Sequence, residues 1–166
     1  MHFERVDGLS VLDDLVKLAY EIYAYTNKDY PRLEWLDKKP EDFEDFCEAY
    51  RDFLKNRVKE EFDEIYVSKK DKKIVACFAF VFGAKDVPWI NNEKCMFVEL
   101  IMVHPSYQKL GLGREIIEFS WERAKRENLR LCISTFRDIK SYGFYLKNNF
   151  KEIEEREGYV IMEKTE

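Results

Sequence analysis

The chain has few of the residues that build metal centres and disulfide frameworks. Its 166 residues include two histidines and four cysteines. The cysteines, Cys47, Cys77, Cys95 and Cys132, are widely spaced and contain no C-x-x-C pair. Structural zinc sites generally use closely spaced Cys and His ligands. We therefore expect neither a bound metal nor a disulfide framework.

Long apolar runs are also missing. The sequence has no uninterrupted apolar run of about 18 residues, the length that suggests a membrane-spanning helix. The first residues, Met1 to Arg5, carry none of the basic, apolar and cleavage regions of a secretory signal. We expect a soluble, cytoplasmic protein that has no membrane partner.

An excess of positive charge is the third absence. The chain has 28 Lys and Arg against 33 Asp and Glu, a formal net charge of -5. Proteins that bind nucleic acid usually present a positive surface to its phosphates, so no nucleic-acid partner is expected. The length suits one compact domain over residues 1–166, large enough to support a small-molecule site without disulfides or metal.

Two amphipathic helices are predicted in the first part of the chain. Apolar residues recur at helical spacing from Leu12 to Tyr23, after Ser10, which is expected to cap the first turn. A second helical pattern opens at Pro40 and places apolar residues from Phe43 to Val58 on one face. The acids of residues 41–48 lie mostly off that face, which favours a solvated surface over a cation-binding patch.

The remainder predicts strands and helices of a single α/β domain. Branched and aromatic runs indicate strands, apolar residues at helical spacing indicate helices, and no internal repeat divides the order. The predicted strands are 65–67, 74–82, 95–103, 129–135, 150–154 and 159–162, the first two forming a hairpin, and the predicted helices are 112–128 and 139–148.

The segment 103–114 joins a buried strand directly to a helix. Gly111 and Gly113 permit a tight turn, after which the backbone amides of a helix N-terminus point at one spot. Such a spot binds phosphate. Lys109 and Arg114 add the positive charge that a pyrophosphate requires.

Three known phosphate-binding patterns could apply to this segment. A Walker-type loop fails because the sequence has no Gly-Lys pair at the required spacing. A dinucleotide fingerprint fails because its third glycine position holds Ile116. The Q/R-x-x-G-x-G/A pattern is matched at every fixed position by residues 108–113, so the segment resembles the coenzyme loop of the GNAT N-acetyltransferases. The preceding Val103-His104-Pro105-Ser106-Tyr107 is similar to the V-x-P-x-[YF] run of that family.

A second segment carries the same resemblance. Residues 141–150 are similar to the family's A-x-x-x-Y-x-x-x-G-F helix, with Tyr145 and Phe150 at the family's spacing. Ser141 replaces the Ala and Asn149 replaces the Gly; Asn is the next-best residue after Gly for a left-handed helix cap. The resemblance covers roughly residues 97–152.

The resemblance implies a single-domain GNAT-like α/β fold. Its twisted, mixed and mostly antiparallel sheet has about six or seven strands and about four flanking helices, and the central parallel strands 95–103 and 129–135 splay apart. Acetyl-CoA, as co-substrate, would lie against the splayed strands. The implied coenzyme contacts are the backbone of Ile101, Met102 and Val103, the loop residues Gln108, Lys109, Leu110, Gly111, Leu112, Gly113 and Arg114, Tyr145, and Asp138, which stands where many members carry an Asn.

The implied activity is transfer of the acetyl group to a primary amine by direct attack, through a tetrahedral intermediate. The backbone N–H of Ile101 would stabilise the oxyanion, and the phenol of Tyr145 would protonate the departing thiolate. Glu99 is the only ionisable side chain between Cys95 and Val103. It acts as the base or positions a water, or else it belongs to a structural ion pair. His104 is interpreted as a turn residue.

The acceptor is expected to contact residues 29–35, Trp89 and Tyr159. Aromatic rings beside Arg32 suit a small-molecule amine carrying a carboxylate, or a peptide N-terminus; the same loop would otherwise only cover the core. A non-catalytic acyl-CoA-binding or sensing domain is the alternative function. Retention of Glu99 and Tyr145 favours the enzyme, and the sequence leaves a homodimer open.

Overall fold

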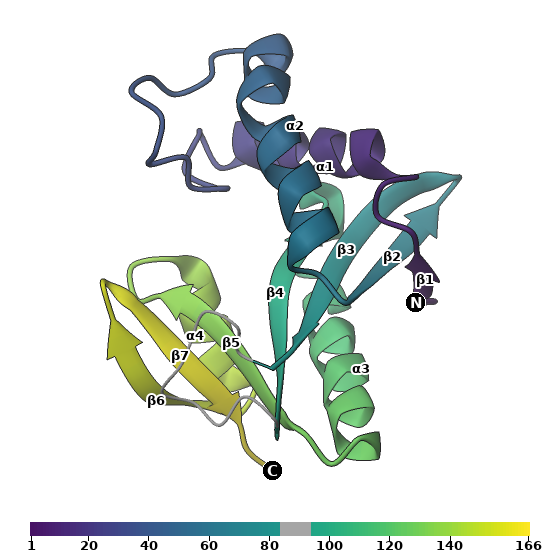
Figure 1. Cartoon of the computed structure of the whole chain (residues 1–166), viewed down its shortest axis with the longest axis vertical. Coiled ribbons are helices and arrows are strands. Elements are labelled where there is room, and N and C mark those ends of the chain that lie inside the picture. Colours follow the sequence, from purple (N-terminus) through teal and green to yellow (C-terminus); the bar gives the residue numbers. More distant parts are fainter. Residues whose placement is uncertain (84–93) are drawn as a thin grey trace. The chain divides into compact units, whose positions relative to one another are not determined.

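A computed structural model of the chain describes residues 1–83 and 94–166 (Figure 1). Within these residues the predicted α/β class is confirmed, with four α-helices and seven strands in one mixed sheet. The helices are α1 (Leu12–Tyr25), α2 (Phe43–Glu60), α3 (Leu112–Arg126) and α4 (Lys140–Lys147), with a short 3-10 helix η2 (Pro105–Tyr107). The strands are β1 (Glu4–Val6), β2 (Glu64–Lys70), β3 (Lys73–Phe82), β4 (Cys95–Val103), β5 (Arg130–Phe136), β6 (Phe150–Arg156) and β7 (Tyr159–Lys164).

The strands are hydrogen-bonded in the order β1-β2-β3-β4-β5-β7-β6. β4 and β5 are parallel, whereas β1 with β2, β5 with β7, and β6 with β7 are antiparallel. The predicted hairpin is confirmed as β2 and β3. Its turn places Asp71 and Lys72 at φ 49° and 66°, the two left-handed residues of the turn type that matches strand twist.

The chain forms two compact units, and β3 and β4 contribute residues to both. The first comprises Met1–Ala79 and Leu100–Leu112; the second comprises Phe80–Glu99 and Gly113–Glu166. Each is described by itself. No helix in the described part of the chain is long and apolar enough to cross a membrane.

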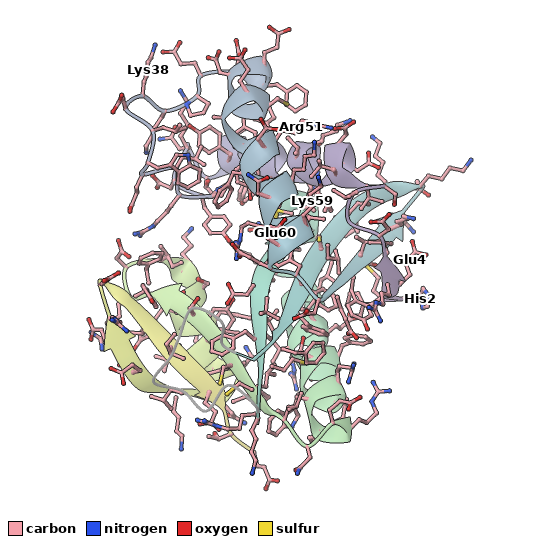
Figure 2. All side chains as sticks on the ribbon, viewed as in Figure 1. His2, Glu4, Lys38, Arg51, Lys59 and Glu60 are labelled. Atoms are coloured by element: carbon pink, nitrogen blue, oxygen red, sulfur yellow. The ribbon has the colours of Figure 1, made fainter. Side chains whose placement is uncertain are left out.

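In the first unit, α1 and α2 cross and bury their apolar faces together (Figure 1). Phe46 and Leu54 of α2 are fully enclosed with Leu15 of α1. At the surface, Arg51 on α2, labelled in Figure 2, donates to Asp13 on α1 at 3.0 Å. Burial of these amphipathic stripes supplies most of the stability that such short helices need.

Both helices begin later than the sequence predicts. The prediction that Ser10 caps α1 is wrong, because its hydroxyl donates to the carbonyl of Asp7 at 2.7 Å and α1 begins after Val11. The prediction that α2 begins at Pro40 is also wrong, because the helix begins at Phe43. Asp42 caps this helix by accepting from the amide of Asp45 at 2.9 Å, and an acidic side chain at this position satisfies an amide that has no partner inside the helix.

The second unit contains β5, β7 and β6 side by side, with α3 and α4 (Figure 1). One face of α3 is buried: Ile116, Ile117 and Ala124 are enclosed, and the hydroxyl of buried Ser120 donates to the carbonyl of Ile116 at 2.7 Å. A bidentate pair from Arg130 on β5 to Glu163 on β7, at 2.8 and 2.9 Å, joins neighbouring strands.

Candidate active site

The residues that the sequence singles out fall into the two units of the chain. The first unit holds the end of β4 and the loop as far as Leu112, and the second holds Glu99, Gly113, Arg114, Asp138 and Tyr145.

The strand β4 has one buried face and one face that opens along its length. Its even-numbered residues 96–102 are all buried. Of the odd-numbered residues, Phe97 is buried, whereas Glu99, Ile101 and Val103 are only half-buried. Because side chains alternate along a strand, these three residues share one face.

The parallel pairing of β4 with β5 is short. The register joins Cys95 to Arg130 and Phe97 to Cys132. Both strands continue, but beyond these residues β5 pairs only with β7 in the part of the chain described here. The register between the two parallel strands thus ends at Phe97 and Cys132, and a strand that continues past its pairing offers backbone groups to an extended ligand.

His104 has a structural role at the end of β4. Its backbone N–H donates to the carbonyl of Val75 at 2.8 Å, and its Nδ1 accepts from the amide of Ser106 at 3.1 Å. Its Nε2 lies 3.3 Å from the carboxylate of Glu21. The ring nitrogens are thus both engaged within the first unit, which agrees with the interpretation of His104 as a turn residue.

Gln108 holds the coenzyme loop against β4. Its Nε2 donates to the carbonyl of Val103 at 3.0 Å, so the amide side chain closes the turn from the last residue of the strand. The sequence identified Gln108 only as a fixed position of the motif. Its partner could not be read from the sequence, because a side chain of this length reaches several backbone carbonyls.

The two glycines of the loop have different roles. Gly111 has φ +88°, and a Cβ there would meet nothing within 4 Å of the protein. Within the protein, the left-handed backbone is therefore the reason that glycine is favoured at this position. Gly113 does not share that conformation; a Cβ there would lie 3.2 Å from Cζ of Phe144. Gly111 thus has the left-handed conformation that suits the expected tight turn, whereas Gly113 lies inside α3, where the missing Cβ leaves room for the ring of Phe144 on α4.

The first turn of α3 follows the loop directly, and exposed side chains lie on both sides of this junction. The first amides of an α-helix have no acceptor within the helix and attract anions. Lys109 and Leu110 are exposed. Arg114 donates to Glu118 at 2.8 Å, but both side chains are mostly solvated, and exposed pairs of this kind contribute about 0–1 kcal/mol. A phosphate can therefore displace Glu118 from Arg114 at little cost.

Tyr145 is buried on α4, with 8% of its surface exposed. Its ring contacts the rings of Phe144 and Phe150 edge-on, each at 5.5 Å between centroids. Asn149, which follows the last turn, has φ 62°, so the predicted left-handed cap is confirmed. Asp138 is exposed in the connection from β5 to α4.

Residues 29–35, which are expected to contact the acceptor, pack only partly on the core. Leu33 is buried in the first unit, whereas Trp35 keeps 52% of its surface exposed and packs on Phe53 of α2 at 4.5 Å between ring centroids. Tyr159 is half-buried at the start of β7. Trp89 lies outside the described residues.

Comparison with known proteins gives a consistent result. The family model described as "Acetyltransferase (GNAT) family" matches residues 19–150. A crystal structure from Pyrococcus horikoshii, described as a candidate acetyltransferase, is 33% identical, with 98% of this chain and 96% of that chain covered and a TM-score of 0.74. A search of curated protein sequences found no match.

Two further solved structures share the fold at lower identity. The PaiA N-acetyltransferase of Thermoplasma acidophilum, in complex with coenzyme A, is 16% identical with full coverage of both chains and a TM-score of 0.70. The ribosomal-protein-alanine N-acetyltransferase of Brucella melitensis is 15% identical with 99% of both chains covered and a TM-score of 0.63.

Proposed function

The chain belongs to the GNAT family of acetyltransferases, and on that premise we propose that this acyltransferase moves the acetyl group of acetyl-CoA to a primary amine of a small molecule or a peptide. The observation that carries the proposal is the coenzyme loop: Gly111 in its left-handed conformation leads into the first turn of α3 beside exposed Lys109 and Arg114. Coenzyme A in the structure of the related fold from Thermoplasma acidophilum supports this assignment.

The residues of the loop fit the coenzyme. Its pyrophosphate is assigned to the backbone amides of residues 109–114, where no Cβ on Gly111 obstructs the approach. The pantetheine arm is assigned to the backbone of residues 101–103, since β4 continues past the end of its pairing with β5. Gln108 supports both groups indirectly, because its bond to Val103 fixes the loop to the strand. Asp138 is proposed to border the coenzyme from the exposed start of α4.

The chemistry requires one proton acceptor and one proton donor. A primary amine has a pKa near 10 and must lose a proton before its nitrogen attacks the thioester carbonyl. Glu99, half-buried on the open face of β4, is assigned to accept this proton directly or through water. The N–H of Ile101 stabilises the oxyanion while the C–N bond forms. When the C–S bond breaks, Tyr145 donates its proton to the thiolate, and the products are an amide and the thiol of coenzyme A.

The acceptor class is assigned from residues of the first unit, namely exposed Trp35 and Phe53 and half-buried Arg32. Arg32, Trp35 and Phe53 offer one cation and two aromatic rings. This combination suits an amine that also carries a carboxylate, or a peptide N-terminus. The ribosomal-protein-alanine N-acetyltransferase with the same fold is an enzyme named for a protein acceptor, which supports including peptides among the candidates.

The test is a screen of small amines and peptides with acetyl-CoA, followed by the release of free thiol. With the best acceptor, Tyr145→Phe should lower turnover by about 10-fold or more while the affinity for acetyl-CoA stays within a few-fold. Glu99→Gln should depress the low-pH side of the rate profile, since neutral Gln accepts no proton. Tight binding of acetyl-CoA without thiol release for any amine would instead favour a binding or sensing domain.

A further inference from the structure

Outside the proposed coenzyme and proton-transfer residues, the second unit contains a compact polar cluster. Arg137, directly after β5, donates to both carboxylate oxygens of Glu152 on β6, at 3.0 and 2.6 Å. The same guanidinium lies 2.5 Å from the carboxylate of Glu155. The hydroxyl of Tyr142 on α4 donates to Glu152. Glu152 therefore joins three segments: the start of the β5–α4 connection, α4 and β6.

A β-bulge makes this cluster possible. Glu152 pairs with Met162 and Glu154 pairs with Ile161, so Ile153 is one extra residue on β6. In a regular strand, residues three apart point to opposite faces. The extra residue reverses the alternation and brings Glu152 and Glu155 to the same face. Arg137 can then bind both carboxylates at once.

The cluster contacts α4 one turn away from Tyr145. Tyr142 and Tyr145 are three residues apart, so they lie on adjoining turns of one helix face. β6 contacts both of them: Glu152 accepts from the hydroxyl of Tyr142, and Phe150, two residues earlier on β6, packs edge-on against the ring of Tyr145. The orientation of the Tyr145 ring therefore depends on how β6 is held against α4.

The helix needs such anchors. α4 has eight residues, and Ile139 at its N-terminus provides no side-chain cap. Helices of this length are marginal without tertiary contacts. A second polar bond, 3.1 Å between the hydroxyls of Ser141 on α4 and Thr135 on β5, joins the same first turn of the helix to β5.

The charge state of Glu152 suits a fixed anchor. Hydrogen bonds from Arg137 and Tyr142 lower the pKa of Glu152 to about 2, so the carboxylate stays ionised throughout the neutral range. The bond to Glu152 raises the pKa of Tyr142, which keeps its donor proton. Because the carboxylate is already occupied by two donors, it is suited to hold a position and not to accept a substrate proton.

We propose that Glu152 is a positioning residue for acetyl transfer: by holding Tyr142 it fixes α4 in the orientation from which the phenol of Tyr145 reaches the departing thiolate. The inference rests on the proposed function, because it takes Tyr145 as the proton donor. It adds Glu152 of β6, and the bulge beside it, to the features proposed to support acetyl transfer.

The experiment measures kcat, KM for acetyl-CoA and thermal unfolding for Glu152→Ala and Tyr142→Phe, each alone and combined with Tyr145→Phe. Glu154→Ala, an exposed glutamate beside the bulge, is the matched control. Glu152→Ala should lower kcat by about 10-fold, since small misplacements of catalytic groups have effects of this order, while KM for acetyl-CoA changes by less than about twofold. Tyr142→Phe should act in the same direction, and Glu154→Ala should turn over like the parent.

The combined variants test whether Glu152 acts through Tyr145. If Glu152 acts through Tyr145, Glu152→Ala should slow the Tyr145→Phe enzyme no further. An equal loss in both backgrounds, or a Glu152→Ala enzyme as active as the control, would overturn the inference. If Glu152→Ala unfolds, the same comparison is made with Tyr142→Phe, alone and combined with Tyr145→Phe. Tyr142→Phe removes one hydroxyl and keeps the ring. A Tyr145→Phe enzyme with parental turnover overturns the proposed acid itself, a result distinct from a failure confined to Glu152.

Discussion

The ring of Phe144 lies against Gly113 so closely that a Cβ on the glycine would be 3.2 Å from Cζ of the ring. This contact joins the first turn of α3 to the helix that carries Tyr145. Gly113 is thus a packing residue, and one ring links the turn proposed to bind the coenzyme to the helix of the proposed proton donor.

Gly113→Ala should lower the free energy of unfolding by about 1 kcal/mol, because the added methyl crowds Phe144. In a Phe144→Leu background the crowding is relieved, and the same change should stabilise the protein by up to about 1 kcal/mol through the higher helix propensity of Ala. Urea unfolding of the four proteins measures both signs. The same change in both backgrounds would show that the ring does not govern this position.

Gly111→Val should abolish most of the affinity for coenzyme A while the domain stays folded, since φ +88° is unfavourable for a β-branched residue and the loop must change shape. Gly158→Val is the matched control: Gly158 has φ +87° and equally open space, but it lies between β6 and β7. Calorimetry should find similar losses of stability in the two variants and a loss of affinity in the first only. Intact binding by folded Gly111→Val would refute the loop assignment.

Gln108→Glu should weaken coenzyme A binding by about 5-fold or more. The carboxylate keeps the size of the side chain but loses the donor to Val103 and faces its carbonyl, and a lost hydrogen bond of this kind is worth about 1 kcal/mol. Gln108→Ala should show the smaller effect, because it removes the bond without adding repulsion. Equal dissociation constants for the parent and Gln108→Glu would show that the bond does not shape the loop.

Stability at acid pH should depend on Glu163. Hydrogen bonds from Arg130 lower the pKa of this carboxyl below its ordinary 4.5. A carboxyl with a lowered pKa in the folded state adds stability above its unfolded pKa, and the contribution disappears as pH falls through the folded value. Glu163→Gln should therefore be less stable near neutral pH and show a flatter decline below about pH 5.

Arg130→Gln supplies the opposite control for that series. Without the guanidinium, partial burial is the main remaining influence on Glu163, and it raises the pKa of the carboxyl. A raised pKa reverses the sign, so acidification through this range should then favour the folded state at Glu163. Urea unfolding at several pH values distinguishes the two slopes; indistinguishable slopes in all three proteins would show that the pair carries no pH dependence.

The sequence by itself determined the local elements and the coenzyme loop. The bounds of β4 and most of α3 follow from alternation and from helical spacing, and the glycines of residues 108–113 predict a tight turn, in which Gly111 has a left-handed backbone. Asn149 as the cap of α4 was likewise readable from its place after the helix. These features depend on interactions among residues a few positions apart, and such interactions are recorded in the spacing of residue types.

The tertiary structure alone decided which distant groups meet. The approach of Phe144 to Gly113 depends on how two helices pack. The binding of both Glu152 and Glu155 by Arg137 depends on a bulge whose position is set by pairing with β7. Strand register and helix packing are fixed by the whole buried surface, so no short stretch of sequence specifies them.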